Sequence, residues 1–303
     1  MTIRDLIIVA TSRLKSARIP EPRLEAESLL AHLLKRDLAW MLAHADALVS
    51  KERAKTYAAL ISKRTRHVPF AQIVGEKGFY GRVFNVTKDV LIPRPETELL
   101  IEAVLSAVAA SGMPPRIPVG MRGGVTGAAT ILDVGTGSGA IGLTLAAELP
   151  KSKAILCDIS AKALSVAKQN ARRMKLTRRI SFKKIDILKN RSLDFTRDDK
   201  RNIILVANLP YLPLATWQAA QPEVRAHEPK LAFVSGKDGL DHYRALFKNL
   251  VRWKHPPVLL ALEAEPGQFE ELSRLARNAM PDARVEILKD LHGDARVLLA
   301  RAA

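Results

Sequence analysis

Residues 131–139 read ILDVGTGSG, an apolar segment that runs into three alternate glycines. The pattern is typical of a buried strand that turns sharply into a helix, which we expect to continue to about Leu149. Glycine lets a ligand approach the backbone closely, and the unpaired N–H groups at the start of a helix favour a carboxylate or a phosphate. The stretch therefore predicts an α/β fold with a ligand site at this turn.

The chain from Thr130 onward alternates strands and helices, as in a doubly wound parallel sheet. Apolar runs predict seven strands, and we expect helices after the first, second, fourth and fifth of them. Only residues 290–294 separate the last two strands, too few for a crossover helix, so these should pair as an antiparallel hairpin. This arrangement is typical of class I, Rossmann-like methyltransferases. The predicted strands are 130–134, 153–158, 180–186, 202–208, 256–263, 283–289 and 295–301.

Asp158 closes the second predicted strand, 19 residues after Gly139. A carboxylate there can accept hydrogen bonds from both hydroxyls of a ribose. NAD and S-adenosylmethionine both fit that geometry. The D-x-G-x-G-x-G spelling that begins at Asp133 resembles methyltransferases more than dehydrogenases, and so favours S-adenosylmethionine. Asp186, at the end of the third strand, is placed to receive an adenine amino group, although by itself it could equally be a helix cap or a turn residue.

The fourth predicted strand ends in Asn208-Leu209-Pro210-Tyr211. This tetrapeptide resembles the N/D-P-P-Y/F signature of enzymes that methylate a planar nitrogen, with leucine where the first proline usually stands. Such a nitrogen is a poor nucleophile because its lone pair is delocalised, so it needs acceptors that hold and aim its N–H groups. The Asn208 side chain and a neighbouring backbone carbonyl can accept, and Tyr211 can stack on the planar group. The motif fits a glutamine amide and the amino group of adenine or cytosine alike.

A second motif separates these possibilities. LIPRPETELL at 91–100, together with NLPY at 208–211, resembles the HemK/PrmC family, whose members methylate the glutamine of the GGQ motif in class I peptide chain release factors. AHLL at 31–34, PFAQIVG at 69–75 and GFYG at 78–81 also follow the family's order. The resemblance covers nearly the whole chain.

The resemblance implies an S-adenosylmethionine-dependent protein-glutamine N5-methyltransferase whose partners are release factors. It also implies that residues 94–98 close over the site, with Phe79 and Tyr80 nearby. The candidate catalytic residues are Asn208, Pro210 and Tyr211. The candidate cofactor-binding residues are Asp133, Gly135, Thr136, Gly137, Gly139, Asp158, Ile159, Asp186, Ile187, Asn208, Arg94 and Pro95. The candidate substrate-binding residues are Asn208, Leu209, Pro210, Tyr211, Phe79 and Glu96.

Three parts are expected along the chain. Residues 1–67 show helical spacing and predict a small N-terminal helical domain for substrate recognition. Residues 68–96 predict a β-hairpin connector, with its first strand at 70–74. Residues 97–303 form the methyltransferase domain. Within it, residues 111–129 hold five glycines and three prolines, which indicates a loop or linker to which we assign no role.

The charge of the chain keeps other activities open. It carries 48 Lys and Arg against 31 Asp and Glu, a net charge of +17, and 12 of these basic residues stand between 172 and 201. Such a cluster fits either a solvated face or a nucleic-acid patch. Methylation of an amino group in RNA or DNA is therefore the alternative function, and a non-catalytic RNA-binding module is a third.

The cysteine count and the apolar runs predict the cellular setting. Cys157 is the single cysteine, so we expect neither disulfides nor a cysteine metal cluster, and the seven histidines show no ligand spacing. The sequence holds no signal-peptide core and no apolar run long enough to span a membrane. We therefore expect a cytoplasmic protein without a metal site.

Overall fold

The computed structural model describes residues 1–110, 129–189 and 202–302. Contacts between residues divide the chain into two compact units, each with its own apolar core. Among the described residues, no helix is both long and apolar enough to cross a membrane. The first unit comprises Met1–Glu76 and Ala220–Glu228, and the second comprises Lys77–Ala219 and Pro229–Ala303.

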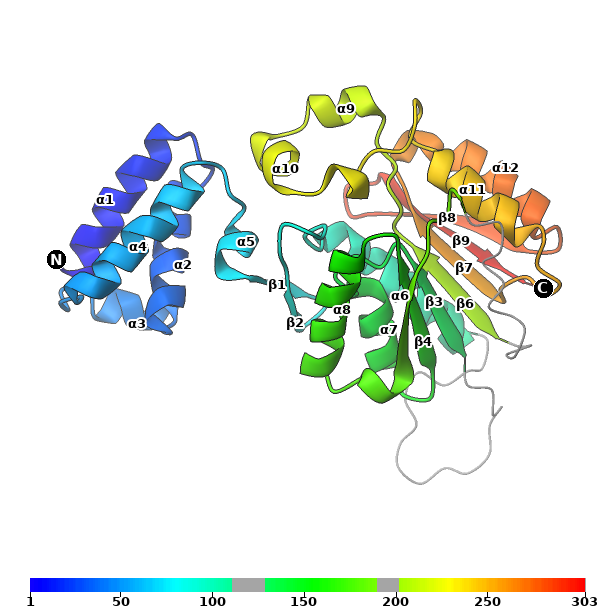
Figure 1. The fold of residues 1–303 in the computed structure, drawn as a ribbon, viewed down its shortest axis with the longest axis horizontal. Helices are drawn as coiled ribbons and strands as arrows, with labels where there is room; N and C mark the ends of the chain where they lie inside the picture. The colour runs from blue at the N-terminus through cyan, green and yellow to red at the C-terminus, as the bar shows by residue number, and fades with distance from the viewer. Residues whose placement is uncertain (111–128, 190–201, 303) are drawn as a thin grey trace. The chain divides into compact units, whose positions relative to one another are not determined.

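The first unit is a cluster of short helices (Figure 1). Its first helix begins with a capping box between Thr2 and Asp5, which satisfies N–H groups at the helix start. Leu6, Ala10 and Leu14 follow at helical spacing and are buried in the core of the unit. The helices are α1 (Ile3–Ser16), α2 (Pro22–Leu34), α3 (Leu38–Ala43), α4 (Lys51–Arg64), α5 (Phe70–Val74) and α10 (Pro222–His227).

A later segment of the chain, Ala220–Glu228, belongs to this first unit. Arg64, at the end of α4, is only 2% exposed and forms ion pairs with Glu25 and with Glu223, the latter at 2.6 Å. Gln72 donates a hydrogen bond from Nε2 to the carbonyl oxygen of His227 at 2.9 Å. Charged and backbone groups thus fix α10 on the helices of the first unit.

The connector differs from its prediction. Phe70–Val74 forms the short helix α5, so the strand predicted at 70–74 is wrong. Phe70 and Ile73 have the three-residue spacing of a helix, and both pack against the core of the first unit. Gly75, with a φ of 83°, ends the helix. The hairpin that follows is short, with strands β1 (Glu76–Phe79) and β2 (Arg82–Asn85).

The second unit is built on the predicted seven-stranded sheet, in the order β5-β4-β3-β6-β7-β9-β8. The first five of its strands along the chain are parallel, and β8 and β9 form the antiparallel C-terminal hairpin. The α/β class and the topology are confirmed. The strands are β3 (Thr130–Val134), β4 (Lys153–Asp158), β5 (Ile180–Lys184), β6 (Ile203–Ala207), β7 (Leu259–Glu263), β8 (Arg284–Lys289) and β9 (Ala295–Arg301).

Helices cover both faces of this sheet (Figure 1). Alternate residues of one strand point to opposite faces, so Ile131 joins the core under α6, α7 and α8, whereas Leu132 joins the core under α11 and α12. The long helices are α6 (Glu98–Ala110), α7 (Ala140–Glu148), α8 (Ala161–Arg173), α11 (Asp241–Leu250) and α12 (Phe269–Ala279). The short elements are α9 (Leu214–Gln218), η1 (Pro95–Thr97), η2 (Thr177–Arg179), η3 (Lys230–Ala232) and η4 (Pro266–Gln268).

Candidate active site

A cavity lies in the second unit at the carboxyl ends of β3, β4, β5 and β6, where parallel α/β sheets usually bind ligands. Segments that are separate in sequence meet at its wall, among them the glycine turn, the residues after β4, the residues after β5 and the start of the NLPY motif. The predicted residues that line it are Gly135, Gly137, Asp158, Ile159, Asp186, Ile187, Asn208, Leu209 and Pro210.

The glycine turn needs its glycines. Gly135, Gly137 and Gly139 have φ values of 76°, 55° and 84°, a region that side chains disfavour. Asp133 lies fully buried behind the turn, where its Oδ2 accepts from the Thr136 hydroxyl at 2.5 Å and from a backbone N–H of α7 at 2.9 Å. Burial raises the pKa of Asp133 to about 7. It is bonded to the turn and to α7, so it organises the loop from behind the cavity wall.

Asp158 lines the cavity, and its carboxylate can accept further hydrogen bonds. Its Oδ2 accepts from the Gly137 N–H at 2.9 Å, and its Oδ1 accepts from the Ser160 N–H at 2.8 Å. Burial raises the pKa of its carboxyl group, while backbone hydrogen bonds to the carboxylate oppose that rise. A carboxylate offers about four acceptor positions, so acceptor capacity remains for a ribose hydroxyl beside the backbone N–H groups. The turn and Asp158 together fit the nucleoside part of S-adenosylmethionine.

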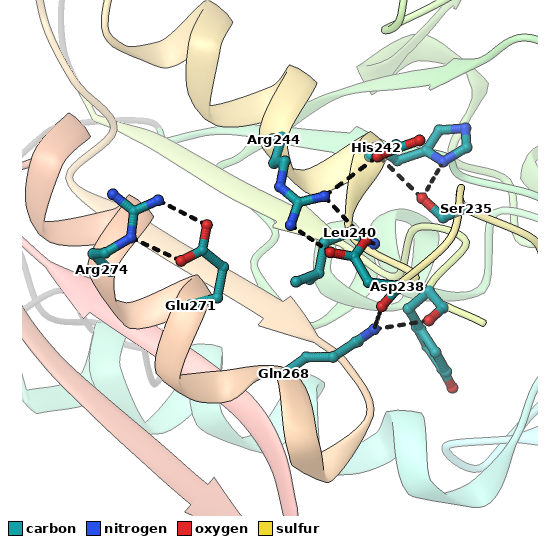
Figure 2. Close-up of polar contacts among 10 residues, drawn as sticks. Ser235, Asp238, Leu240, His242, Arg244, Gln268, Glu271 and Arg274 are labelled. Carbon is teal, nitrogen blue, oxygen red and sulfur yellow. Dashed lines mark hydrogen bonds and ion pairs between the residues drawn. The ribbon is translucent and has the colours of Figure 1, made fainter. Parts of the chain in front are cut away.

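His242 lines the same cavity and was missed by the sequence analysis. Its Nδ1 lies 2.7 Å from the Ser235 hydroxyl, which also accepts from the His242 backbone N–H at 3.0 Å (Figure 2). Burial lowers the pKa of His242, so the ring is neutral near pH 7. Ser235 therefore contacts both the ring and the backbone of His242.

Leu209 occupies the position where the related motif has proline, and the structure accommodates it. Its N–H group, which proline lacks, donates to the Tyr243 hydroxyl at 3.2 Å. That hydroxyl in turn donates to the carbonyl oxygen of Glu263. The Leu209 side chain also packs on Gly135, where a Cβ would lie 2.9 Å from its Cδ2. The glycine turn and the NLPY motif are therefore in direct contact.

The other end of the NLPY motif is held through the backbone of Tyr211. Gln268 donates from one Nε2 to the carbonyl oxygens of Tyr211 and Asp238, at 2.9 and 3.0 Å (Figure 2). Gly239 fits tightly against the same carbonyl, because a Cβ there would lie 1.9 Å from the Tyr211 oxygen. The Tyr211 side chain is half-buried, and burial raises the pKa of its phenol.

The remaining candidates are not brought to the cavity wall. Phe79 is 2% exposed and packs edge-to-face on Phe84, with ring centroids 6.0 Å apart. Arg94 and Glu96 belong to the short turn that begins α6. The candidates outside the wall are Asp133, Thr136, Gly139, Arg94, Pro95, Tyr211, Phe79 and Glu96.

Besides His242, most of the apolar wall was not predicted from the sequence. The missed lining residues stand next to motifs that were recognised: just before the IPRPETE string, after Asp158, around Asp186 and in the segment after α10. Closeness to a recognised motif is the one signal that could have identified them. They are Asp89, Val90, Leu91, Val134, Cys157, Ser160, Ala163, Ile185, Pro229, Leu231 and Ala232.

Comparisons with known proteins agree with this geometry. Residues 5–75 match the PrmC N-terminal domain, and residues 126–225 match a methyltransferase domain. A release factor glutamine methyltransferase of Cereibacter sphaeroides is 36% identical over 301 residues, 99% of each chain. One of Chlorobaculum tepidum is 38% identical over 285 residues, 94% of this chain and 92% of its own.

A solved structure shows the same fold at much lower identity. The N-terminal domain of human METTL16, in complex with SAH, is 14% identical with a TM-score of 0.52, over 84% of this chain and 99% of that one. The methyltransferase match answers the choice between NAD and S-adenosylmethionine that the glycine turn left open. The chain is an S-adenosylmethionine-dependent methyltransferase, and it belongs to the release factor glutamine methyltransferase family.

Proposed function

We propose that this enzyme methylates the side-chain amide nitrogen, N5, of the glutamine in the GGQ motif of class I peptide chain release factors. The observation that carries the proposal is the position of Asn208, Leu209 and Pro210 in the wall of the cofactor cavity. Relatives that carry the release factor glutamine methyltransferase name over nearly the whole chain support this substrate.

The main task of the protein in this reaction is to position the glutamine nitrogen in line with the methyl group. S-adenosylmethionine supplies a methyl group on a positively charged sulfur. The glutamine nitrogen forms a bond to the methyl carbon as the carbon–sulfur bond breaks, and the nitrogen then loses a proton to solvent. The Asn208 side-chain oxygen and the carbonyl oxygen of Leu209 or Pro210 accept the two amide N–H groups, aim the nitrogen in line and stabilise its developing positive charge.

The substrate assignment is tested with labelled S-adenosylmethionine and three separate pools: release factor, ribosomal RNA and DNA. We expect label in the release factor alone, and none in a release factor whose GGQ glutamine is replaced by alanine. Label in RNA or DNA but not in release factor would replace this proposal by the nucleic-acid alternative.

The basic cluster at 172–201 gives that alternative partial support only. Residues 190–201 of the cluster lie outside the described part of the chain. Within the described part, Arg179 donates to the carbonyl oxygens of Leu149 and Ser152 at 3.2 and 2.8 Å, and Arg173 donates to Asn85 at 2.9 Å. These two arginines thus form hydrogen bonds within the protein that stabilise its fold.

We also propose roles for the parts of the chain and a setting. The helical N-terminal domain, predicted at residues 1–67, recognises the body of the release factor, residues 68–96 connect, and residues 97–303 carry the chemistry. Residues 94–98 close over the bound substrate. Because release factors act on ribosomes, the enzyme works in the cytoplasm.

A further inference from the structure

Three side chains from separate segments meet at Asn208. Thr97 belongs to the η1 turn of the IPRPETE string, Asn208 follows β6, and Glu263 ends β7. Asn208 donates from Nδ2 to the Thr97 hydroxyl at 3.3 Å, and the Glu263 carboxyl group is hydrogen-bonded to both Thr97 and Asn208. Thr97 and Glu263 are 5% and 3% exposed, so protein rather than water determines these contacts.

The ionised form of Glu263, which predominates above about pH 7, fixes the direction of each hydrogen bond. An ionised carboxylate only accepts, so the Thr97 hydroxyl donates to Glu263, and the contact from Asn208 to Glu263 must come from Nδ2. The second Nδ2 hydrogen goes to the Thr97 oxygen. Both donors of the Asn208 amide are then used within the protein, and Oδ1 is left as an acceptor.

This direction matters because a side-chain amide can flip. Rotated by half a turn, Asn208 would offer N–H donors to a substrate nitrogen that itself carries only N–H groups, and the two would repel each other. We propose that Thr97 and Glu263 are positioning residues that hold Nδ2 of Asn208 and so keep Oδ1 for the methyl acceptor. The inference rests on the proposed function, and it restricts the acceptor to a group that donates N–H bonds.

Tyr243 of α11 also links Glu263 to the backbone of the motif. The Tyr243 hydroxyl bridges the N–H of Leu209 and the carbonyl oxygen of Glu263. Glu263 is therefore linked to the motif twice, through its carboxyl group to the Asn208 side chain and through its carbonyl to the Leu209 backbone.

The arrangement costs stability, which argues for a functional reason. The Oε2 atom of Glu263 is buried without a hydrogen-bond partner in the described structure, and burial raises the pKa of the carboxyl group to about 7. An apolar side chain at this position would avoid that cost. Buried carboxyl groups with displaced pKa values concentrate at functional sites.

The test measures single-turnover methylation of a release factor by the full-length enzyme. Thr97→Val and Glu263→Leu remove the polar groups while keeping similar volume. Each should lower turnover roughly 10-fold, with S-adenosylmethionine affinity and the release-factor KM within about 3-fold, because each loses one hydrogen bond that orients Asn208. Thr97→Ser, which keeps the hydroxyl, should restore most of the rate.

Thr144→Val is the matched control. Thr144 is fully buried in α7, and its hydroxyl has no hydrogen-bond partner within the described structure, so the variant makes the same chemical change away from Asn208. We expect turnover close to that of the unmodified enzyme. Should Glu263→Leu fail to fold by thermal unfolding, Thr97→Val and its serine rescue decide alone.

A double variant separates positioning from general support. If Thr97 acts through Asn208, adding Thr97→Val to Asn208→Ala should cost no further turnover. A further 10-fold loss there, or unchanged turnover in a folded Thr97→Val or Glu263→Leu enzyme, overturns the inference. The proposed function fails differently: a normal rate in Asn208→Ala, or label in nucleic acid alone, would remove Asn208 or the release factor from the reaction.

Discussion

At the scale of single residues, the Asp158 carboxylate both holds the backbone of the cavity wall and can accept hydrogen bonds from a ligand. Its two oxygens hold the N–H groups of Gly137 and Ser160, and both atoms keep further acceptor capacity. The same carboxylate therefore fixes the glycine turn and presents acceptors where a ribose is expected. Loss of the side chain should affect binding of the cofactor before it affects the fold.

We expect Asp158→Ala to weaken S-adenosylmethionine binding about 10- to 150-fold, since hydrogen bonds to a charged group contribute roughly 1.5 to 3 kcal/mol. Calorimetric titration measures the affinity, and circular dichroism confirms the fold. Unchanged affinity in a folded variant would remove Asp158 from the cofactor site.

Asn208 is expected to act on the acceptor and hardly on the cofactor. Removing one preorganised polar contact of this kind costs about 10² to 10³ in turnover. Asn208→Ala should lose methylation of release factor by that factor, while S-adenosylmethionine affinity stays within about 3-fold. Single-turnover assays beside the titration check both, and near-normal methylation would contradict the role of the whole NLPY motif.

Glu263 gives a stability prediction with a definite sign. Its folded pKa of about 7 lies above the ordinary 4.5, so the folded state favours the protonated form. Its contribution to stability is complete below about pH 4.5 and declines as the pH rises through 7. Glu263→Gln should therefore flatten the fall in free energy of unfolding between pH 5 and 7.5, measured by urea denaturation.

Asp133, whose pKa burial also raises to about 7, supplies a slope of the same sign that the Glu263→Gln variant keeps. The slope should accordingly shrink without vanishing. A slope identical to that of the unmodified enzyme would show that Glu263 titrates normally in the folded protein.

The sequence alone predicts Asp158 and Asn208 as site residues, and both line the cavity, but it does not predict the residues that support them. The glycine spelling and NLPY are local strings, and a local string can be recognised without a structure. Thr97 lies 111 residues before Asn208, and nothing in the spelling of either motif states that the two touch. The Glu263 network and the His242 pair depend on which strand ends adjoin and on burial, which only the folded chain determines.

At the scale of elements, local pattern predicted the sheet well and the connector poorly. The core strands β3, β6 and β7 are fully buried and mostly apolar, so their type follows from the sequence. Residues 70–74 are too few to show a period. Their helix depends on Pro69 before it, Gly75 after it and an apolar core on one side.

The turn at Gly239 packs directly against the backbone of the NLPY motif at Tyr211. Gly239→Ala would place a Cβ against the Tyr211 carbonyl in a backbone with a φ of 82°. Gly293 is the matched control, because its φ is 87° but a Cβ there would meet nothing within 4 Å. Gly293→Ala should cost only the backbone strain, about 1 to 2 kcal/mol.

Gly239→Ala should cost more in the free energy of unfolding than Gly293→Ala and should also reduce turnover, because the clash moves Tyr211. Thermal unfolding and single-turnover methylation of both variants provide the comparison. Equal losses in the two variants would show that the close approach at Tyr211 has no consequence.

At the scale of the whole molecule, the path of the chain links the two units covalently more than once. The chain leaves the cavity wall at Pro210, joins the first unit over Ala220–Glu228, and returns to the cavity wall at Pro229. Residues 220–228, which follow the NLPY motif along the chain, thus belong to the helical unit. Arg64 holds this excursion in place through Glu223.

Arg64→Met tests that attachment. Removing one partner of a buried ion pair leaves the others unpaired and costs about 3 to 5 kcal/mol, and slightly less is expected here because Glu25 and Glu223 keep some solvent contact. Arg4→Met is the control, since Arg4 and Asp46 form an exposed pair worth at most about 1 kcal/mol. Hydrogen exchange followed by mass spectrometry should show faster exchange across residues 220–228 in Arg64→Met and no change there in Arg4→Met. Unaltered exchange in a folded Arg64→Met enzyme would mean that backbone contacts such as Gln72 to His227 suffice to hold the segment on the helical unit.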